Sequence, residues 1–332
     1  MAGLSVVGNI SILVYRVVWA RKSLNKSNGI LFLNLASADL MMGVYLTIIA
    51  RVDAAFRGEY VLYDQAWREG GLCRVAGFLS TLSSETSAMF VVLITLDMLH
   101  AVKFPLKHNR YKKVIFRMVK LMCAASWLLG LCLASLPVIV SDWEVYSRHS
   151  ICIGLPLNSE SYPGSGYGVA IFLGVNSVLF LIIAAGQLAT NRVIWTNSKK
   201  AGLVGEQARR RLQRDMIVAR KLFAIALTDF ACWFPICIMG FIAHMGYTIP
   251  DAAYAWTAIV ALPINSSINP FLYNGHNVFS TIVKKYRNST FFRSHHECSC
   301  KQIYTVGIKN SVQFSSHNCK KHRKKNSGGK SL

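Results

Sequence analysis

Long apolar stretches alternate with short polar segments along the chain. They cover roughly residues 1–20, 28–50, 72–99, 117–140, 165–189, 219–245 and 252–274. Each is close to the ~20 residues that an α-helix needs to cross a bilayer, and none shows the ~10-residue alternation of a membrane-spanning strand. Because lipid offers no hydrogen-bond partners to an open backbone, the pattern predicts an all-α membrane protein that folds as a seven-transmembrane helix bundle.

The polar segments on the two sides of the predicted bundle differ in charge. Lys and Arg gather after spans 1, 3 and 5 and beyond span 7. The opposite segments hold the acidic residues Asp53, Glu59, Asp64, Glu69, Asp142, Glu144, Glu160 and Asp251. Since basic loops stay on the cytoplasmic side, we expect a multi-pass plasma-membrane protein with its N-terminus outside and its C-terminus in the cytoplasm.

Composition narrows the class of protein. The chain has 332 residues, of which 53% are hydrophobic and 16% charged, and its formal net charge is +22. Soluble domains carry about 25% charged residues, so the composition argues against a soluble globular protein. Disordered chains have low hydrophobicity, so a disordered chain is excluded. The one-sided distribution of basic residues accounts for the net charge, and no nucleic-acid partner is expected.

Three segments follow from these patterns. Residues 1–275 hold the seven spans. Residues 276–293 predict a short amphipathic helix after the last span, with apolar residues opposite lysines and arginines, and such a helix binds the anionic lipid of the inner leaflet. Residues 294–332 are basic and polar, and we expect a disordered cytoplasmic tail.

Two pairs of cysteines lie outside the spans or at their ends. Cys73 and Cys152 are the only cysteines on the predicted outer side, which is oxidising, so the sequence predicts a disulfide between them; two free thiols are the alternative. Cys298 and Cys300 follow the amphipathic stretch. Palmitoylation and unmodified cytosolic thiols are both open interpretations for this second pair.

Short motifs in the spans resemble a known family. They are Gly8–Asn9 in span 1, Leu33–Asp39 in span 2, Trp127 in span 4, Cys232–Pro235 in span 6 and Asn269–Tyr273 in span 7. In this order, and with the outer cysteine pair, they are similar to those of the rhodopsin-like (class A) G-protein-coupled receptors. The match covers nearly the whole membrane region.

Longer stretches narrow the resemblance. GFLSTLSSETS in span 3, TDFACWFP in span 6 and LPINSSINP in span 7 resemble the leucine-rich-repeat-containing receptors, closest to the relaxin-family peptide receptors. The resemblance implies a non-enzymatic receptor that responds to a hormone or peptide, couples to a heterotrimeric G protein and signals by outward movement of span 6. A receptor dimer is a further expected partner.

The resemblance also assigns polar residues inside the membrane. It places Asp39 in a sodium pocket, with Ser87, Trp233, Asn265 and Asn269 at the matching positions. A protonated Asp39 that is merely hydrogen-bonded is the alternative, and no cofactor is expected beyond this allosteric Na⁺. Carboxylate, hydroxyl and amide oxygens are ligands that suit a hard cation.

An activation switch is expected at spans 6 and 7. The resemblance pairs Asp229 with Asn269, which restrains span 6 against span 7. The remaining members of the expected switch are Trp233, Pro235, Pro270 and Tyr273. Prolines inside helices remove a hydrogen bond and create kinks, although proline packing without motion is the alternative. Glu85 is a further ionisable residue within a span, and the sequence names no partner for it.

Two departures from the family bear on function. The expected G-protein-facing segment reads Asp97-Met98-Leu99, where the family has Arg at the middle position. Met has neither charge nor N–H donors, so the sequence predicts impaired or altered coupling. The chain also shows no leucine-rich repeat, and we expect an ectodomain to be absent and span 1 to be truncated. A non-signalling decoy or a dimerisation partner of a full-length receptor is the alternative.

Overall fold

The computed structural model describes residues 1–154, 163–201, 206–250, 253, 256–261 and 264–272. These residues are mainly helical, and no β-strand occurs among them. The predicted amphipathic helix 276–293, the tail 294–332, Tyr273, Cys298 and Cys300 all lie outside the described residues.

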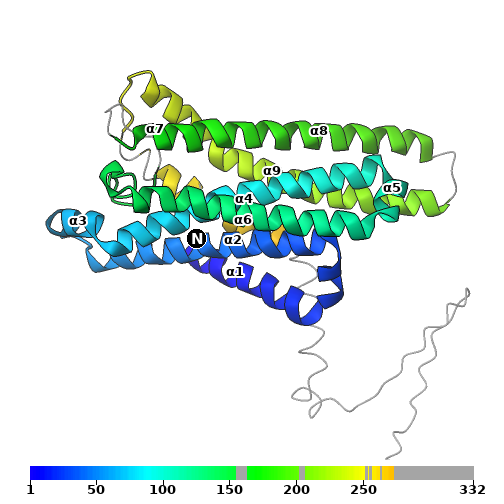
Figure 1. Cartoon of the computed structure of the whole chain (residues 1–332), viewed down its shortest axis with the longest axis horizontal. Coiled ribbons are helices and arrows are strands. Elements are labelled where there is room, and N and C mark those ends of the chain that lie inside the picture. Colours follow the sequence, from blue (N-terminus) through cyan, green and yellow to red (C-terminus); the bar gives the residue numbers. More distant parts are fainter. Residues whose placement is uncertain (155–162, 202–205, 251–252, 254–255, 262–263, 273–332) are drawn as a thin grey trace, which may run out of the picture. The chain divides into compact units, whose positions relative to one another are not determined.

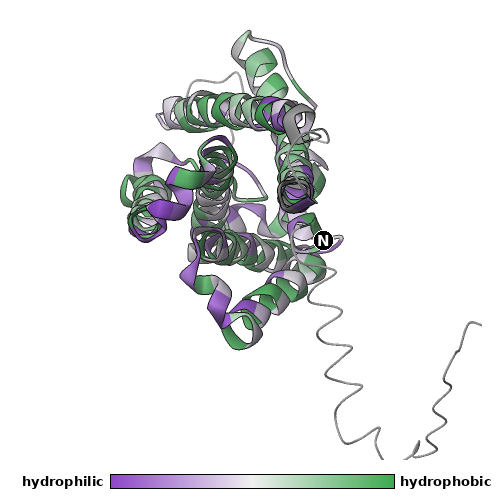
Figure 2. Cartoon of the chain, turned by 90° about the vertical axis from the view of Figure 1, so that its right-hand side faces the viewer, coloured by the Kyte–Doolittle hydropathy of each residue, from purple (hydrophilic) through white to green (hydrophobic). Residues whose placement is uncertain are grey.

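The α-helices follow one another with short connections. They are α1 Ala2–Val14, α2 Ser27–Ala55, α3 Tyr60–Glu69, α4 Gly71–Lys103, α5 Pro105–Arg110, α6 Lys112–Ile139, α7 Ser165–Gly168, α8 Asn176–Ala201 and α9 Glu206–His244. Short 3₁₀ segments are η2 Arg21–Asn25 and η3 Ser141–Trp143, and π-helical segments are η1 Tyr15–Trp19, η4 Val169–Val175 and η5 Thr257–Ala261. The long helices run side by side (Figure 1), and a view along them shows a bundle around a common interior (Figure 2).

Six of the predicted spans appear as helices long and apolar enough to cross a membrane, within the part of the chain that the structure describes. The seventh is represented by η5 and by the helical residues 264–272. Span 6 differs most from its prediction, because α9 begins at Glu206 rather than near residue 219. The first turns of α9 are rich in Arg and Gln, which are good helix formers. Because these residues are polar, the apolar stretch used for the prediction begins later than the helix does.

The sequence pattern missed two short helices outside the spans. Helix α3 follows α2 and carries Trp67 on its buried side, while Val61 and Leu62 are exposed. Helix α5 begins at Pro105, which suits the first turn of a helix because proline lacks an N–H there. Neither segment has the length or uniform apolar character of a span, so hydropathy alone does not reveal them.

Helix α4 is the central helix of the bundle. In its most apolar window 67% of the residues are buried, compared with 22% for the first span. On the surrounding helices α6 and α8, large apolar side chains such as Leu121, Leu128 and Leu181 are more than 60% exposed. Apolar residues that face outward at mid-helix are typical of contact with lipid, so the fold is that of a bundle whose polar groups lie inside.

Glycines allow two helices to approach α4 closely. A Cβ on Gly130 of α6 would fall on the methyl group of Thr86, and a Cβ on Gly186 of α8 would lie 2.5 Å from the methyl group of Thr95. Small residues at helix contacts are a general feature of membrane bundles because they permit tight packing without a water-driven hydrophobic effect.

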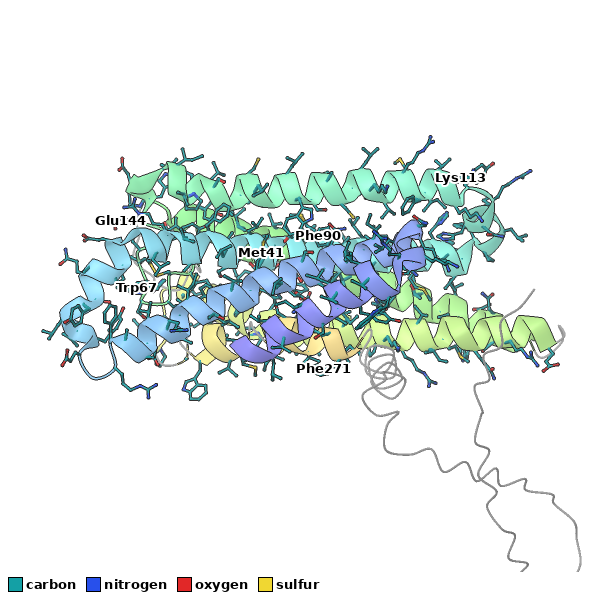
Figure 3. The ribbon with its side chains drawn as sticks, turned by 90° about the horizontal axis from the view of Figure 1, so that it is seen from below. Met41, Trp67, Phe90, Lys113, Glu144 and Phe271 are labelled. Atoms are coloured by element: carbon teal, nitrogen blue, oxygen red, sulfur yellow. A yellow bond between two sulfur atoms is a disulfide. The ribbon has the colours of Figure 1, made fainter. Side chains whose placement is uncertain are left out.

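The two ends of the bundle carry different residues. Trp67 and Glu144 lie at one end and Lys113 at the other, with Phe90 between them (Figure 3). We call the end with Trp67 the outer end and the end with Lys113 the inner end, following the charge-based prediction.

Candidate functional site

Asp39 of α2 lies at the centre of a buried polar network. Its side chain is fully buried. It accepts hydrogen bonds from Ser87 Oγ at 3.0 Å, Asn269 Nδ2 at 2.9 Å and Ser266 Oγ at 3.4 Å. These donors come from α4 and from residues 264–272 of the last span, so one carboxyl group joins three spans.

The network extends to the first span through Asn9 and Ser5. Asn9 donates from Nδ2 to the backbone oxygens of Ser5 and Ser266, at 2.8 and 3.0 Å. Ser5 Oγ donates to the backbone oxygen of Asp39 at 3.1 Å. The Gly8 position lies against Pro270, where an added Cβ would be 3.0 Å from the ring, so the first and last spans meet directly beside the polar network.

The oxygens around Asp39 suit a hard cation. The carboxylate, the hydroxyls of Ser87 and Ser266, and the amide oxygen of Asn269 lie in one buried cluster. Asn269 Oδ1 is fully buried and has no hydrogen-bond partner among the described residues. A free amide oxygen beside a carboxylate is an appropriate ligand for Na⁺, and these residues therefore fit the predicted ion.

The structure groups the expected sodium residues differently from the sequence prediction. Ser87 and Asn269 contact Asp39, and Ser266, which the prediction did not include, does so as well. Trp233, which was expected to line the pocket and not to bind the ion, packs against Phe172 and Phe180, with ring centroids 5.9 and 6.3 Å away. Ser266 belongs to the pair of serines just before the Asn-Pro motif. Its hydroxyl group, within an apolar span, was the sequence feature that could have marked it as a partner of Asp39.

Asp229 of α9 pairs with Asn265, and the expected Asp229–Asn269 pair is wrong. Asn265 Nδ2 donates to Asp229 Oδ1 at 2.6 Å. The rotation of the last span about its own axis explains the difference. Asn269 donates to Asp39, while Asn265, one turn earlier, faces α9. Thr228 Oγ1 also contacts Asn265 Oδ1 at 3.5 Å. The contact between spans 6 and 7 exists, but a different amide makes it.

Glu85 of α4 has the partner that the sequence did not name. It is fully buried and accepts a hydrogen bond from Asn176 Nδ2 at 3.0 Å. Asn176 begins α8 directly after the π-helical segment η4. Such π-helical turns occur often at functional sites, and here one immediately precedes the residue that ties span 5 to span 3.

The inner end of α4 is mainly apolar. Met98 is 6% exposed and belongs to the main hydrophobic core together with Ile183 of α8 and Leu222 of α9. Asp97 is also buried, and among the described residues its carboxyl group interacts electrostatically with His100 without a hydrogen bond; Leu99 is half-buried. Span 3 therefore presents no positive charge at the position of Met98.

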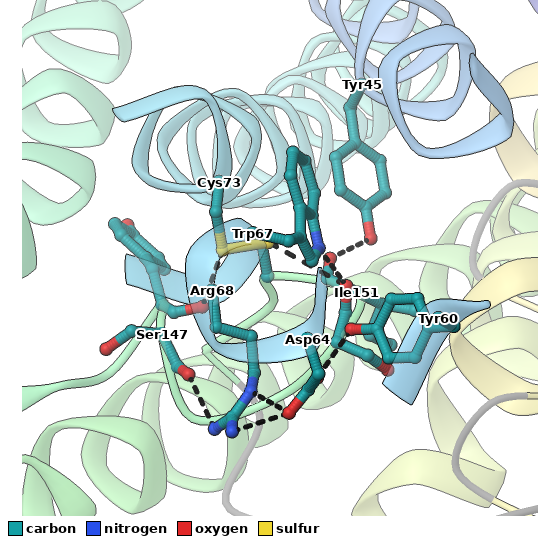
Figure 4. The surroundings of a disulfide bond; sticks show 11 residues. Tyr45, Tyr60, Asp64, Trp67, Arg68, Cys73, Ser147 and Ile151 are labelled. Atoms are coloured by element: carbon teal, nitrogen blue, oxygen red, sulfur yellow. Dashed lines mark hydrogen bonds and ion pairs between the residues drawn. A yellow bond between two sulfur atoms is a disulfide. The ribbon is translucent and has the colours of Figure 1, made fainter. Parts of the chain in front are cut away.

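The predicted disulfide between Cys73 and Cys152 is confirmed, with Cα atoms 5.3 Å apart. It ties α4 to the segment after α6 (Figure 4). Trp67 Nε1 donates to the backbone oxygen of Ser150 at 2.6 Å, and the Tyr45 hydroxyl donates to that of Ile151 at 2.9 Å. One disulfide and two hydrogen bonds between uncharged groups thus fix this segment to α2, α3 and α4.

An ion pair completes the outer end. Arg68 contacts Asp64 at 2.6 Å, and the Tyr60 hydroxyl donates to Asp64 at 2.7 Å. Partial burial acts to raise the pKa of Asp64, but the hydrogen bonds from Arg68 and Tyr60 outweigh it, so this pKa lies below its ordinary value. Arg68 also reaches the backbone oxygen of Ser147 at 3.4 Å.

A cavity of about 690 Å³ opens beside this region. Its walls come from α1, α2, α3 and η5 and from the segment held by the disulfide, and include Leu46, Ile49, Asp53, Tyr60, Ile151 and Val260. The size is within the ~300–1,000 Å³ range of small-ligand sites, which are mostly apolar with a few polar groups.

Comparison with known proteins identifies the family. The family model described as 7 transmembrane receptor (rhodopsin family) matches residues 8–273. The chain therefore belongs to the rhodopsin family of seven-transmembrane receptors. Membership of this family makes it a non-enzymatic membrane receptor, as the resemblance carried by the motifs in its spans implied.

Its relatives narrow the group to receptors related to the relaxin receptors. The chain is 36% identical over 272 residues to G-protein coupled receptor GRL101 of Lymnaea stagnalis, covering 81% of this chain and 23% of that protein. It is 32% identical over 268 residues to Relaxin receptor 2 of Canis lupus familiaris, covering 78% and 35% of the two chains. With human Relaxin receptor 1 the identity is 31% over 271 residues, covering 80% and 34%. The chain thus spans about a quarter to a third of the length of these relatives.

Proposed function

We propose that this chain is the membrane-spanning unit of a hormone or peptide receptor whose coupling to a heterotrimeric G protein is weakened at Met98. The single observation that carries the proposal is the buried polar network, in which Asp39 joins spans 2, 3 and 7 while Asp229 joins spans 6 and 7. Buried ionisable residues in spans are costly and are usually retained for function.

The ligand side of the proposal rests on the relatives and on the outer end. Two of the relatives are named relaxin receptors, which supports a hormone or peptide as the ligand class. The outer end is held by the disulfide and by Trp67, and the apolar cavity lies next to it. The N-terminus lies outside the plasma membrane and the C-terminus in the cytoplasm, as the distribution of basic residues indicates.

The proposed switch is the contact between spans 6 and 7. The hydrogen bond from Asn265 to Asp229 holds the resting arrangement, and its loss favours outward movement of span 6, which is a two-state rearrangement of packed helices. Pro235 lies inside α9, two residues after the buried Trp233. A proline at this point provides a flexible position because it removes one helix hydrogen bond.

A sodium ion is part of the proposal. When bound, Na⁺ supplies a positive charge that balances the Asp39 carboxylate. Asp39, Ser87, Ser266 and Asn269 are the residues that hold it, because their oxygens converge in one buried cluster. The ion stabilises the resting packing of spans 2, 3 and 7.

Met98→Arg tests the proposal directly. Ligand-independent G-protein activation is measured in cells for the natural chain and for Met98→Arg, with Met98→Leu as the size-matched apolar control, at equal surface expression. We expect Met98→Arg to signal at least about threefold above both others, since a cationic donor is restored at the inner end of span 3. Equal signalling by all three variants contradicts the role given to Met98.

A second candidate function is a non-signalling decoy or a dimerisation partner of a full-length receptor. The burial of Met98 in the apolar core favours it, because no charge remains there to engage a partner protein. In the same experiment, a silent natural chain with an active Met98→Arg variant supports this second function. If neither the natural chain nor Met98→Arg exceeds the signalling level of the empty-vector control despite surface expression, the signalling function is wrong for this chain.

A further inference from the structure

Two histidines meet at the inner end of the bundle, outside the polar network described above. His100 lies in the last turn of α4 and His108 in α5. Their Nδ1 atoms are 3.1 Å apart, and their ring centroids are 5.3 Å apart at an interplanar angle of 48°. Both side chains are half-buried, so they are held by their surroundings and still accessible from the inner end.

The distance between the two nitrogens matches that of a pair of metal ligands. Imidazole nitrogens bind Zn²⁺ at about 2.0–2.1 Å, and in a tetrahedral arrangement two such nitrogens lie about 3.3 Å apart. The two rings come from different helices and already meet through the same ring atom. We propose that His100 and His108 bind one divalent transition-metal ion, such as Zn²⁺, through their Nδ1 atoms.

The charges around the pair set the strength of the site. Asp97, one turn before His100 on α4, interacts electrostatically with that histidine and favours a cation. The last turn of α4 also presents the negative end of a helix dipole. Lys103 and Lys107 oppose a cation, although each lies over the ring of Phe104, 5.3 and 5.6 Å from its centre. The favourable and unfavourable charges therefore offset each other in part, so that the surroundings permit a bound cation.

Water completes the coordination of the ion. Among the described residues, no group of three His, Cys, Asp or Glu side chains is placed to hold a metal. A site with two protein ligands binds weakly and reversibly, and its affinity follows the order of first-row divalent metals, with Cu²⁺, Ni²⁺ and Zn²⁺ above Mn²⁺. Mg²⁺ and Ca²⁺ prefer oxygen ligands and do not bind here.

Binding would fix α5 against α4. Helix α5 has only six residues, from Pro105 to Arg110, and one metal ion shared with α4 replaces a single hydrogen bond by two coordinate bonds. The inference is independent of the proposed receptor function, since it concerns the packing of α5 and is measured without any signalling readout.

The test is thermal unfolding of the full-length purified chain in detergent, with increasing ZnCl₂ or NiCl₂ and with MnCl₂ and MgCl₂ as comparisons. We expect a saturable rise in the melting temperature of about 2–5 °C with Zn²⁺ and Ni²⁺, little change with Mn²⁺ and none with Mg²⁺. The rise is lost in His100→Ala and in His108→Ala. His149→Ala, which changes a histidine at the outer end, keeps the full rise.

Two results overturn the proposal. One is an unchanged melting temperature for the natural chain at saturating Zn²⁺ and Ni²⁺. The other is a rise that persists in the double variant His100→Ala/His108→Ala, which places the metal elsewhere, for example at His295, His296, Cys298 and Cys300. If the alanine variants do not fold, His108→Gln replaces them, because its amide keeps a hydrogen bond but is a poor ligand for these metals.

Discussion

The middle of α4 and its inner end are built in opposite ways. In the middle, Ser87 and Glu85 take part in hydrogen bonds to two other spans, and the carboxyl group of Asp39 accepts three side-chain donors. At the inner end, Met98 is buried among apolar side chains, and neighbouring Asp97 has no hydrogen bond from the described residues. One helix therefore carries a buried polar network and, about three turns away, an apolar contact.

This difference indicates that the two regions have separate tasks. The polar network holds the spans in one arrangement, since each buried group depends on a partner from another span. The inner end adds packing but supplies no charged group that responds when the spans move. We infer that a change of state in the middle of the bundle is transmitted only weakly to the inner surface through α4.

The largest expected effect comes from Asp39→Ala. It leaves the donors of Ser87, Ser266 and Asn269 buried without their acceptor. At about 0.6 kcal/mol for each membrane hydrogen bond, with an added cost for unpaired donors, we expect a loss of about 2–3 kcal/mol, measured as a lower melting temperature in detergent.

The matched control for Asp39→Ala is Asp97→Ala at the inner end. For this control we expect a loss of stability of less than about 1 kcal/mol, because no hydrogen bond is lost.

The response to Na⁺ distinguishes the same chains further. Replacing an inert organic cation by Na⁺ raises the melting temperature of the natural chain and of Asp97→Ala but leaves Asp39→Ala unchanged. Equal responses of all three chains contradict the proposed sodium site.

The next effect concerns the stability of Met98 variants. Met98→Arg places a charge where the native side chain is 6% exposed, and we expect a cost of about 1–3 kcal/mol, limited because the long side chain extends toward the inner surface. Met98→Leu keeps the volume and costs less than about 1.5 kcal/mol. Thermal unfolding of both variants separates this cost from their signalling. If Met98→Arg is as stable as Met98→Leu, the apolar description of the inner end is wrong.

Sequence patterns predicted the spans well because the membrane imposes a simple rule on their composition. Six spans agree with the helices found among the described residues. The helix ends were less accurate, as in α9, because hydropathy marks the edge of the lipid and not the end of a helix. The short helices α3 and α5 depend on local contacts such as the hydrogen bond of Trp67 to Ser150, which no periodicity records.

Individual side-chain partners were harder to predict than the residues themselves. The sequence identified Asp39, Asp229 and Glu85 as costly and therefore significant, but it paired Asp229 with Asn269. Asn265 and Asn269 are four residues apart, and the rotation of the last span decides which of them faces α9 and which faces Asp39. That rotation is set by packing between distant segments, such as Gly8 against Pro270, and not by local sequence.

A smaller effect is expected from the bond between spans 6 and 7. Asp229→Ala and Asn265→Ala each remove the same hydrogen bond, so both raise basal signalling by about threefold, which corresponds to about 0.6 kcal/mol. The double variant gives no further increase, because the pair acts as one unit. The measurement is made in the Met98→Arg background, where coupling is expected to be visible.

Additive effects of Asp229→Ala and Asn265→Ala would falsify the pairing that the structure assigns. Thr228→Val serves as the control, since its hydroxyl contacts Asn265 only at 3.5 Å and its loss leaves the Asp229 bond in place. A rise with Thr228→Val equal to that with Asp229→Ala indicates general loosening of α9 instead of a specific bond.

The smallest expected effect lies at the outer end and depends on pH. Because Arg68 and Tyr60 hold the pKa of Asp64 below its ordinary value, the folded state binds this proton less readily than the unfolded state. The stabilisation is present above the unfolded pKa of about 3.9 and is lost as the pH falls through the lower folded value. Both partners are about one-third exposed, so the contribution of the ion pair to stability is below about 1 kcal/mol.

The measurement is the melting temperature between pH 7 and pH 3, which should fall slightly more for the natural chain than for Asp64→Asn. The control is Asp53→Asn, from the exposed pair with Arg57, which should follow the natural chain. A curve for Asp64→Asn that parallels the natural chain over this range would show that the ion pair does not stabilise the outer end.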